Sequence, residues 1–349
     1  MTAGGKLILG IESSCDETAA AIVADGAQVL SSVVASQIEL HARFGGVVPE
    51  IASRAHLEAI NNVIAQALQI AQAGQEQISA VAVANQPGLI GSLLVGLMAA
   101  KTLAWAWEKP LLAVNHVHAH AYSAALDGQP PQYPAVALIA SGGHTSLYRA
   151  GSPMEIELLG STIDDAAGEA FDKVSAILGL GYPGGPAIDK AARDGNPQAI
   201  RFPRSLLKGQ SLDFSFSGLK TAVLYHVCGV PGAVRQGAEK GAQRLSPREI
   251  ADVAASFQAA VVDTLCIKLR RAVKATGARS VILGGGVAAN SALRAAVTEL
   301  GKKHRLAVHI PAMKYCVDNA AMVAGLAYHY LQAGLTAPLD LNALATVRR

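Results

Sequence analysis

The sequence predicts an α/β protein built from two related halves. Its 349 residues are too many for one simple core and suit two domains. Hydrophobic residues make up 51% of the chain and charged residues only 16%, which is typical of a globular protein. A strand followed by a small polar turn at Leu9–Ser14 recurs at Leu138–Gly143, and each turn leads into a second strand. This repeat predicts two similar domains.

The first half begins with three strands. Lys6–Ile11 is apolar enough to be buried on both faces, and a polar turn from Glu12 to Thr18 follows it. The dipeptide Asp25-Gly26 predicts a hairpin between the next two strands. We expect strands at 6–11, 19–24 and 28–36, a helix at 53–73, a strand at 78–84 and a helix at 92–107.

The longest apolar stretch, Leu89–Trp107, is interrupted by Ser92 and Lys101 and is rich in Gly and Ala. We interpret it as a buried helix rather than a membrane span. The N-terminus lacks the apolar run of an export signal, because Glu12 and Asp16 come too early. The four cysteines have no paired spacing, which suits a reducing compartment. Together these features predict a cytoplasmic protein.

The second half repeats the opening. It begins with a buried strand at 135–140, a polar turn at Ser141–Thr145 and a returning strand at 146–150. A helix at 251–275, a strand at 280–283 and a helix from Asn290 follow, and the terminal helix Ala320–Leu331 is expected to return to the first lobe. Prolines 130, 131 and 134 indicate a hinge. We therefore expect an N-terminal lobe at 1–132, completed by 320–349, and a C-terminal lobe at 133–319.

The two polar turns point to a particular α/β fold. Gly- and Ser-rich turns between antiparallel strands expose backbone N–H groups that can bind a phosphate. Two such turns at the starts of related halves resemble the paired phosphate loops of the actin, Hsp70 and sugar-kinase superfold, whose nucleotide lies in the cleft between two lobes. This resemblance implies a fold and does not fix a function.

The segment Asn115–His120 carries the strongest chemical signal. On a helix, His116 and His120 share one face, while His118 points away from it. Two imidazoles one turn apart are a common way to hold a divalent metal. The zinc-protease motif HExxH needs a glutamate where this chain has Val117. The pattern therefore predicts a metal site with further ligands and a different chemistry.

Asp318 is the candidate for a third ligand. If the terminal helix packs beside the histidines, Asp318 completes a set of two histidines and one carboxylate, which suits Fe(II) or Zn(II) and leaves positions open. Alternatively, Asp318 caps its helix. His118 is expected to be a core or surface residue rather than a metal ligand. Asp16 and Glu17, in the first turn, are candidates for a general base or an orienting carboxylate.

Further candidate ligand residues lie in the second half. The glycines of Gly284–Asn290 allow a ligand close to the backbone, although a tight turn explains them equally well. Asn290 is either a helix N-cap or a ribose or base contact. The pattern of Asp164–Lys173 predicts a helix with three carboxylates on one face, either solvated or binding ribose hydroxyls. Another close-approach loop, Gly181–Pro186, precedes Asp189.

Basic residues are concentrated in one segment. Residues 201–248 hold eight basic and two acidic side chains, a local charge of +6 in a chain whose net charge is +3. Such an excess attracts phosphate backbones, with Arg43 and Arg54 as further candidates, although a solvated loop would have the same composition.

Taken together, the motifs resemble one family. They occur in the order Gly10–Thr18, Gly45–Glu50, the His116/His120 pair, Ser141–Thr145, Asp164–Lys173, Asp213–Lys220, Gly284–Asn290 and Asp318-Asn319. This combination, between residues 6 and 330, resembles the TsaD (Gcp/OSGEP) family of tRNA adenosine threonylcarbamoyltransferases. The stretch 231–245 matches none of the family's motifs.

The resemblance implies the actin-like fold and transfer of a threonylcarbamoyl group from threonylcarbamoyl-AMP to the exocyclic amine of adenosine 37, in tRNAs that read ANN codons. By matching position, His116, His120 and Asp318 would hold one divalent metal, with Fe(II) favoured and Zn(II) possible. The implied partners are tRNA, a shorter paralogue called TsaB and an ATPase called TsaE. No association with a membrane is implied. The implied adenylate-binding residues are Ile139, Ala140, Ser141, Gly142, Gly143, Asp172, Gly185, Asp189 and Asn290.

Three competing functions explain fewer of these features. A sugar kinase or chaperone-type ATPase would account for the phosphate turns but not for the histidine pair. A metal-dependent peptidase would account for a metal but lacks HExxH. A non-catalytic scaffold, like the shorter paralogue, has no need of His116, His120 and Asp318.

Overall fold

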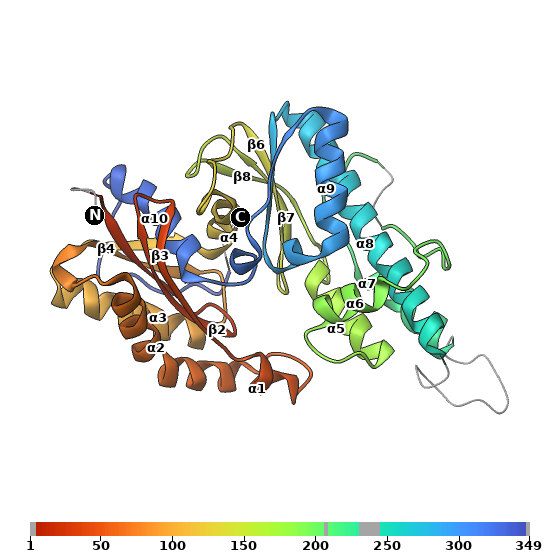
Figure 1. Cartoon of the computed structure of the whole chain (residues 1–349), viewed down its shortest axis with the longest axis horizontal. Helices are drawn as coiled ribbons and strands as arrows, with labels where there is room; N and C mark the ends of the chain where they lie inside the picture. Colours follow the sequence, from red (N-terminus) through yellow and green to blue (C-terminus); the bar gives the residue numbers. More distant parts are fainter. Residues whose placement is uncertain (1–4, 206–208, 230–244, 347–349) are drawn as a thin grey trace. The chain divides into compact units, whose positions relative to one another are not determined.

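The computed structural model describes residues 5–205, 209–229 and 245–346, which belong to two compact units (Figure 1). The first unit comprises residues 1–131, 151–156 and 311–349, and the second comprises residues 132–150 and 157–310. The chain thus returns to the first unit at Pro311, before the terminal helix begins. Most of the stretch 231–245 lies outside the described residues.

The first unit contains a five-stranded mixed sheet in the order β3-β2-β1-β4-β5. Strand β1 pairs antiparallel with β2 and parallel with β4, so the N-terminal hairpin lies beside the later parallel strands. The predicted hairpin is present, with Asp25 and Gly26 at positive φ. The strands are β1 (Leu7–Glu12), β2 (Glu17–Ala24), β3 (Gln28–Ser36), β4 (Ile78–Gln86) and β5 (Leu111–Asn115).

Helices cover both faces of this sheet, because residues that alternate along each strand are apolar in both directions. Leu9 and Ile11 pack in a core with α2 (Pro49–Ala71) and α3 (Ile90–Ala106). Ile8 packs on the other side with α4 (His116–Tyr122) and α10 (Ala320–Gln332). A short helix, α1 (Ile38–Ala42), precedes α2.

The second unit repeats this strand plan. Its sheet has the order β10-β9-β6-β7-β8, with β6 antiparallel to β7 and parallel to β9. Placing β6 against β1 superimposes the two orders, which confirms the prediction of two related halves. The strands are β6 (Ala135–Ala140), β7 (Thr145–Ala150), β8 (Ile156–Ser161), β9 (Ser280–Gly284) and β10 (Ala307–His309).

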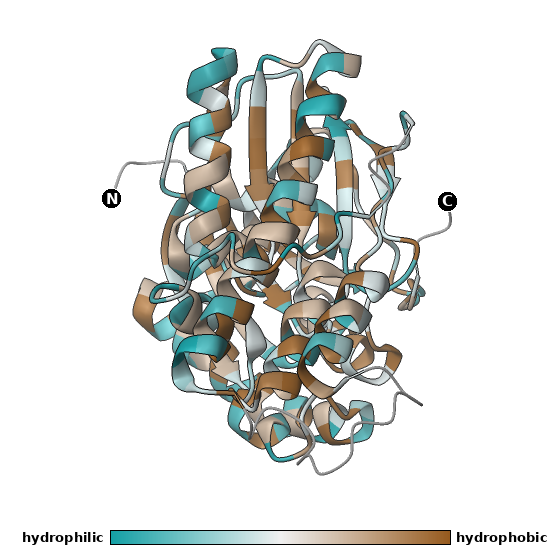
Figure 2. Cartoon of the chain, turned by 90° about the vertical axis from the view of Figure 1, so that its right-hand side faces the viewer, coloured by the Kyte–Doolittle hydropathy of each residue, from teal (hydrophilic) through white to brown (hydrophobic). Residues whose placement is uncertain are grey.

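The central strand of the second unit, β6, is hydrophobic and buried along its whole length. Helices of the chain carry both hydrophilic and hydrophobic residues along their length (Figure 2). Among the described residues, only α8 has the length and hydropathy to cross a membrane, and 67% of its apolar window is buried inside the protein. It is therefore a core helix. The helices are α5 (Ala167–Leu178), α6 (Gly184–Ala192), α7 (Ser217–Cys228), α8 (Pro247–Thr276) and α9 (Ser291–His304).

Two helix starts differ from the prediction. Helix α2 begins at Pro49, because a proline is well suited to the first turn of a helix. The predicted helix at Asp164–Lys173 was wrong at its start: α5 begins at Ala167, so Asp164 and Asp165 lie in the preceding turn. The carboxylate of Asp164 instead accepts hydrogen bonds from Ser215, Phe216 and Ser217, which holds that turn outside the helix.

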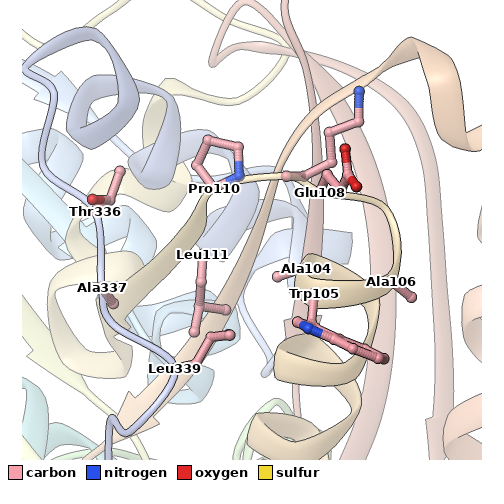
Figure 3. Close-up of a pocket in the computed structure, with 10 residues that line it drawn as sticks. Ala104, Trp105, Ala106, Glu108, Pro110, Leu111, Thr336, Ala337 and Leu339 are labelled. Atoms are coloured by element: carbon pink, nitrogen blue, oxygen red, sulfur yellow. The ribbon is translucent and has the colours of Figure 1, made fainter.

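The C-terminal segment crosses the edge of the first sheet. The backbone N–H of Ala337 donates to the carbonyl of Leu111 at 2.8 Å. A hollow of about 850 Å³ lies beside this bridge and is lined by Trp105 of α3, Leu111 of β5 and Leu339, among others (Figure 3). None of its lining residues belongs to the predicted site.

Candidate functional site

The two predicted metal-binding histidines lie on α4, which follows β5 without a loop. The side chain of Asn115 caps this helix, accepting hydrogen bonds from the N–H groups of Val117 at 2.9 Å and His118 at 3.2 Å. The cap fixes the first turn, so His116 and His120 lie one turn apart on the same face. Their ring centroids are 4.6 Å apart, and the planes of the two rings are nearly perpendicular.

Asp318 completes the group. Its Oδ1 atom lies 3.0 Å from Nε2 of His120 and 3.5 Å from Nε2 of His116, and the three ligand atoms all lie within 4.8 Å of one another. The alternative role, helix capping, belongs to the next residue, since Asn319 accepts from the N–H of Met322 at the start of α10. The side chain of Asp318 is 19% exposed, whereas both imidazoles are buried.

Glu12, at the end of β1, was not predicted as a site residue. Its Oε2 atom lies 2.8 Å from Nδ1 of His116, and its Oε1 accepts from the N–H of Ser14 at 2.6 Å. The side chain is fully buried. A carboxylate here favours a proton on Nδ1, so Nε2 of His116, which lies 3.5 Å from Asp318, is the nitrogen that can bind a cation once its own proton is lost. The signal available in the sequence was a lone glutamate ending a buried strand.

The electrostatic potential at this group is negative, because two carboxylates lie beside His116. Burial lowers the pKa of His116, but the nearby charges of Glu12 and Asp318 outweigh this effect and raise the pKa to about 9. The carboxylates of Glu12 and Asp318 that hold this proton would also favour a metal cation, which has to displace the proton when it binds. The Nδ1 atom of His120 is buried and has no hydrogen-bond partner among the described residues. His118 lies outside this group, and burial lowers its pKa.

Asp16 and Glu17 follow β1 and lie within electrostatic reach of Asp318. Burial, reinforced by Asp318, raises the pKa of Asp16. Glu17 is the first residue of β2 and accepts a hydrogen bond from the hydroxyl of Ser36 at 2.8 Å. Burial raises the pKa of Glu17 to about 7, because the hydrogen bond from Ser36 offsets only part of the desolvation.

The second unit carries the glycine-rich turn after β6. The N–H of Ser141 donates to the carbonyl of His144 at 2.7 Å, which closes the turn. Gly142 and Gly143 are exposed, and a Cβ added to either would meet no atom within 4 Å. The start of α5 packs on this turn, since Gly168 donates to the carbonyl of Ser141 at 3.1 Å. The strand residues Ile139 and Ala140 are buried.

A second glycine turn packs against the first. Gly285 has φ +85, and a Cβ at this position would lie 2.3 Å from the carbonyl oxygen of Ala140. Only glycine fits this close approach. Asn290 then caps α9 by accepting from the N–H of Leu293 at 3.0 Å, and its amide donates to Gln258 at 2.7 Å. Asn290 is therefore the N-cap of α9.

The remaining predicted ligand residues of the second unit lie on α5 and α6. Asp172 accepts a hydrogen bond from the N–H of Gly184 at 2.6 Å, which ties α5 to the start of α6. Gly185 is open, because a Cβ added there would meet no atom within 4 Å. Asp189 accepts from the hydroxyl of Ser291 at 2.7 Å, at the start of α9. These contacts link the middle of α5 to the start of α6, and the second half of α6 to the start of α9.

The family comparison decides what this site belongs to. The TsaD family profile, described as tRNA N6-adenosine threonylcarbamoyltransferase, matches residues 28–325. The chain belongs to the TsaD family. Curated proteins of that name are 53% identical in Symbiobacterium thermophilum and 51% identical in Geobacter sp. strain M21, each over 97% of this chain and 95% of the relative. As a member of the TsaD family, the protein is a transferase that modifies adenosine in tRNA.

Solved structures show the same fold at low sequence identity. HypF of T. kodakarensis aligns with a TM-score of 0.62 and 15% identity, over 94% of this chain and 48% of that one. Component A of the Acidaminococcus fermentans (R)-2-hydroxyglutaryl-CoA dehydratase aligns with a TM-score of 0.51 and 13% identity, over 94% and 99%. These likenesses concern the fold alone, and they agree with the actin-like superfold expected for the TsaD family.

The basic segment predicted to contact the tRNA is only partly described. Lys208, Arg235, Lys240 and Arg244 lie outside the described residues. Of the others, Arg204 pairs with Asp263 at 2.8 Å, Lys220 with Asp165 at 3.1 Å and Arg248 with Asp252 at 3.4 Å. Neighbouring carboxylates therefore balance much of the described positive charge.

Proposed function

We propose that this protein transfers the threonylcarbamoyl group of threonylcarbamoyl-AMP to the exocyclic amine of adenosine 37, in tRNAs that read ANN codons, and releases AMP. The observation that carries the proposal is the convergence of His116, His120 and Asp318, with Glu12 behind His116. A sugar kinase or a non-catalytic scaffold would not need this set. A peptidase would need a general base in the position of Val117.

We assign one divalent cation to Nε2 of His116, Nε2 of His120 and the carboxylate of Asp318, with Fe(II) favoured and Zn(II) possible. The donor set fits, because two imidazoles and one carboxylate are ligands that both metals accept, and Glu12 leaves the Nε2 atom of His116 free to coordinate. Such a cation would supply Lewis-acid stabilisation of the negative charge that develops on acyl and phosphate oxygens.

We assign the adenylate to the second unit. The exposed N–H groups of Gly142 and Gly143 and the N-termini of α5 and α6 are suited to a phosphate. Asp172 and Asp189 offer carboxylate oxygens to ribose hydroxyls. Ile139, Ala140, Ser141, Gly185 and Asn290 would shape the remainder of the site. Holding the acyl-adenylate in one orientation is a large share of the expected rate acceleration.

The transfer itself needs no protein nucleophile. The tRNA amine attacks the carbamoyl carbon, the bond to the phosphate oxygen breaks, and the amine loses a proton. We propose Asp16 as the carboxylate that orients the amine or accepts this proton. Glu17 is the weaker candidate, since its buried carboxylate is already bound to Ser36 within the sheet.

We further propose that the enzyme acts in the cytoplasm with a TsaB-like paralogue and a TsaE-like ATPase. Leu57 of α2 and Leu94 and Met98 of α3 are exposed apolar residues that line a groove of about 370 Å³ in the first unit. An uncovered apolar row of this kind favours a protein partner. We assign this groove to the paralogue.

The test is a transfer assay with threonylcarbamoyl-AMP that is radiolabelled in its threonine, tRNA, ATP and the partner proteins, together with casein hydrolysis as the assay for peptidase activity. We expect label in the tRNA and no peptide release. Replacing adenosine 37 by guanosine should abolish incorporation. Label that persists in this tRNA would contradict the assigned position, and casein hydrolysis would contradict the transferase mechanism.

A further inference from the structure

The second unit contains a concentration of positive charge outside the predicted basic segment. Residues 264–310 hold nine lysines and arginines and one acidic residue, Glu299, a local charge of +8 in a chain whose net charge is +3. This exceeds the charge of residues 201–248. Unlike that segment, all 47 of these residues are described, and six of the cations are exposed: Arg270, Lys274, Arg279, Lys302, Lys303 and Arg305. We call these six the basic ridge.

The topology brings the basic ridge to one end of the strands of the sheet. Helix α8 leads into β9 and α9 leads into β10, and these two strands are parallel, with Ser280 opposite Ala307. The N–H of Ala307 also donates to the carbonyl of Arg279 at 3.2 Å. The C-terminal ends of both helices therefore lie at the end of the sheet where β9 and β10 begin. Figure 1 shows α8 and α9 side by side.

The two helices form a shallow groove between them. Arg270 of α8 and Lys303 and His304 of α9 line this groove, whose volume is about 330 Å³. The single acidic residue, Glu299, lies 3.8 Å from Lys302, and both side chains are more than 70% exposed. An exposed pair at this distance neutralises little of the local field.

Helix capping explains only part of this charge. Cations in the last turn of a helix interact favourably with the helix dipole, which accounts for Lys274, Lys302 and Lys303. The effect falls off within one turn, so it does not account for Arg270. Arg279 and Arg305 lie beyond the helix ends.

We propose that the basic ridge binds the sugar-phosphate backbone of the tRNA substrate, at a distance from the adenosine that is modified. Arg279 and Gly285 lie at opposite ends of β9, about 20 Å apart for extended chain. The basic ridge therefore lies at one end of the strands, and the glycine turns lie at the other end. Contacts to phosphates fix the position and orientation of a nucleic acid without reading its sequence. The inference rests on the tRNA substrate of the family and adds the surface that holds it.

The test is the triple variant Lys274→Gln/Lys302→Gln/Lys303→Gln, studied with the full chain and its partner proteins. The dissociation constant for unmodified tRNA is measured over a series of salt concentrations. Each lost phosphate contact reduces the slope of log affinity against log salt by about one, so we expect a slope smaller by two to three and affinity about tenfold weaker at low salt. The KM for tRNA should rise, whereas kcat at saturating tRNA should stay unchanged.

The matched control is Lys6→Gln/Lys109→Gln/Arg149→Gln, which removes the same charge from positions elsewhere on the surface. It should leave the salt slope as in the wild-type protein. An unchanged slope in the ridge variant, with wild-type transfer intact, overturns this inference but not the proposed function. Loss of partner binding with unchanged tRNA affinity also overturns it and identifies an acidic protein surface as the ligand. Absence of transfer by the wild-type protein contradicts the proposed function instead.

Discussion

The turn after β1 and the turn after β6 occupy equivalent places in two related sheets, yet their chemistry is opposite. The first is largely buried and is flanked by the carboxylates of Glu12 and Glu17, and Glu12 holds the imidazole of His116. The second is rich in glycine, exposed and open, with room around Gly142 and Gly143. A repeated strand plan therefore fixes where a turn is placed but leaves its chemistry free. The first turn suits a cation site, whereas the second suits an anion.

The largest expected effect concerns the cation side of this comparison. Replacing His116 by Ala removes one of three ligands, so we expect loss of metal binding and a fall in transfer of at least about 100-fold, with the fold intact. Elemental analysis of untagged protein and the threonine transfer assay measure the two effects. His118→Ala is the matched control and should retain both. Full activity in His116→Ala would refute the metal assignment.

Glu12→Gln tests whether the first turn acts through its charge. The amide keeps the shape of the side chain but holds the Nδ1 proton of His116 less strongly, so metal affinity should fall by about 10- to 100-fold. Competition with a chelator measures this change. Ser14→Ala, which removes only the hydroxyl 3.2 Å from the same nitrogen, should have a much smaller effect. Equal losses in the two variants would show that the carboxylate charge is not the cause.

Two glycine variants separate packing from ligand binding on the second side. Gly285→Ala places a Cβ 2.3 Å from the carbonyl oxygen of Ala140 at positive φ, so it should lower the free energy of unfolding by about 2–4 kcal/mol. Gly142→Ala meets no neighbour and should change stability by less than about 1 kcal/mol, while weakening AMP binding by narrowing the phosphate site. Denaturant unfolding and calorimetric AMP titration measure the two. Equal destabilisation would remove the distinction between the packed and the open turn.

The smallest effect concerns the pH dependence of stability. The pKa of Glu17 is raised to about 7, above its unfolded value, so the folded protein binds this proton more tightly than the unfolded chain does. Stability should therefore fall as pH rises from about 4.5 to 7, by about 1–3 kcal/mol in metal-free protein. Glu17→Gln should remove this fall and be more stable than the wild type at pH 8 but not at pH 4. Parallel pH profiles of the two proteins would show that Glu17 is not responsible.

Much of the fold was predictable from hydrophobic periodicity, because β6 and the long helices are continuous apolar or amphipathic runs. The histidine pair was predictable because both residues lie on one short helix. Glu12 was not, since its role depends on β1 lying beside β4, with β5 next to β4, a pairing that no local pattern encodes. The start of α5 was missed for a similar reason, because Asp164 is held by Ser215–Ser217, more than 50 residues away in the sequence. The positive charge of residues 264–310 was visible in the sequence, but which six of these cations are exposed, and that α8 and α9 carry them to the same end of the sheet, follows only from the fold.

The return of the chain to the first unit at Pro311 has a consequence for biosynthesis. Helix α10 packs on β1 so closely that a Cβ on Gly10 would lie 2.4 Å from the carbonyl oxygen of Ala320. A nascent chain that has emerged only as far as residue 310 therefore lacks both Asp318 and the helix that covers one face of its first sheet. The ribosome must deliver the whole second unit and Asp318 before a complete ligand set exists, so metal loading is expected to follow synthesis of both units.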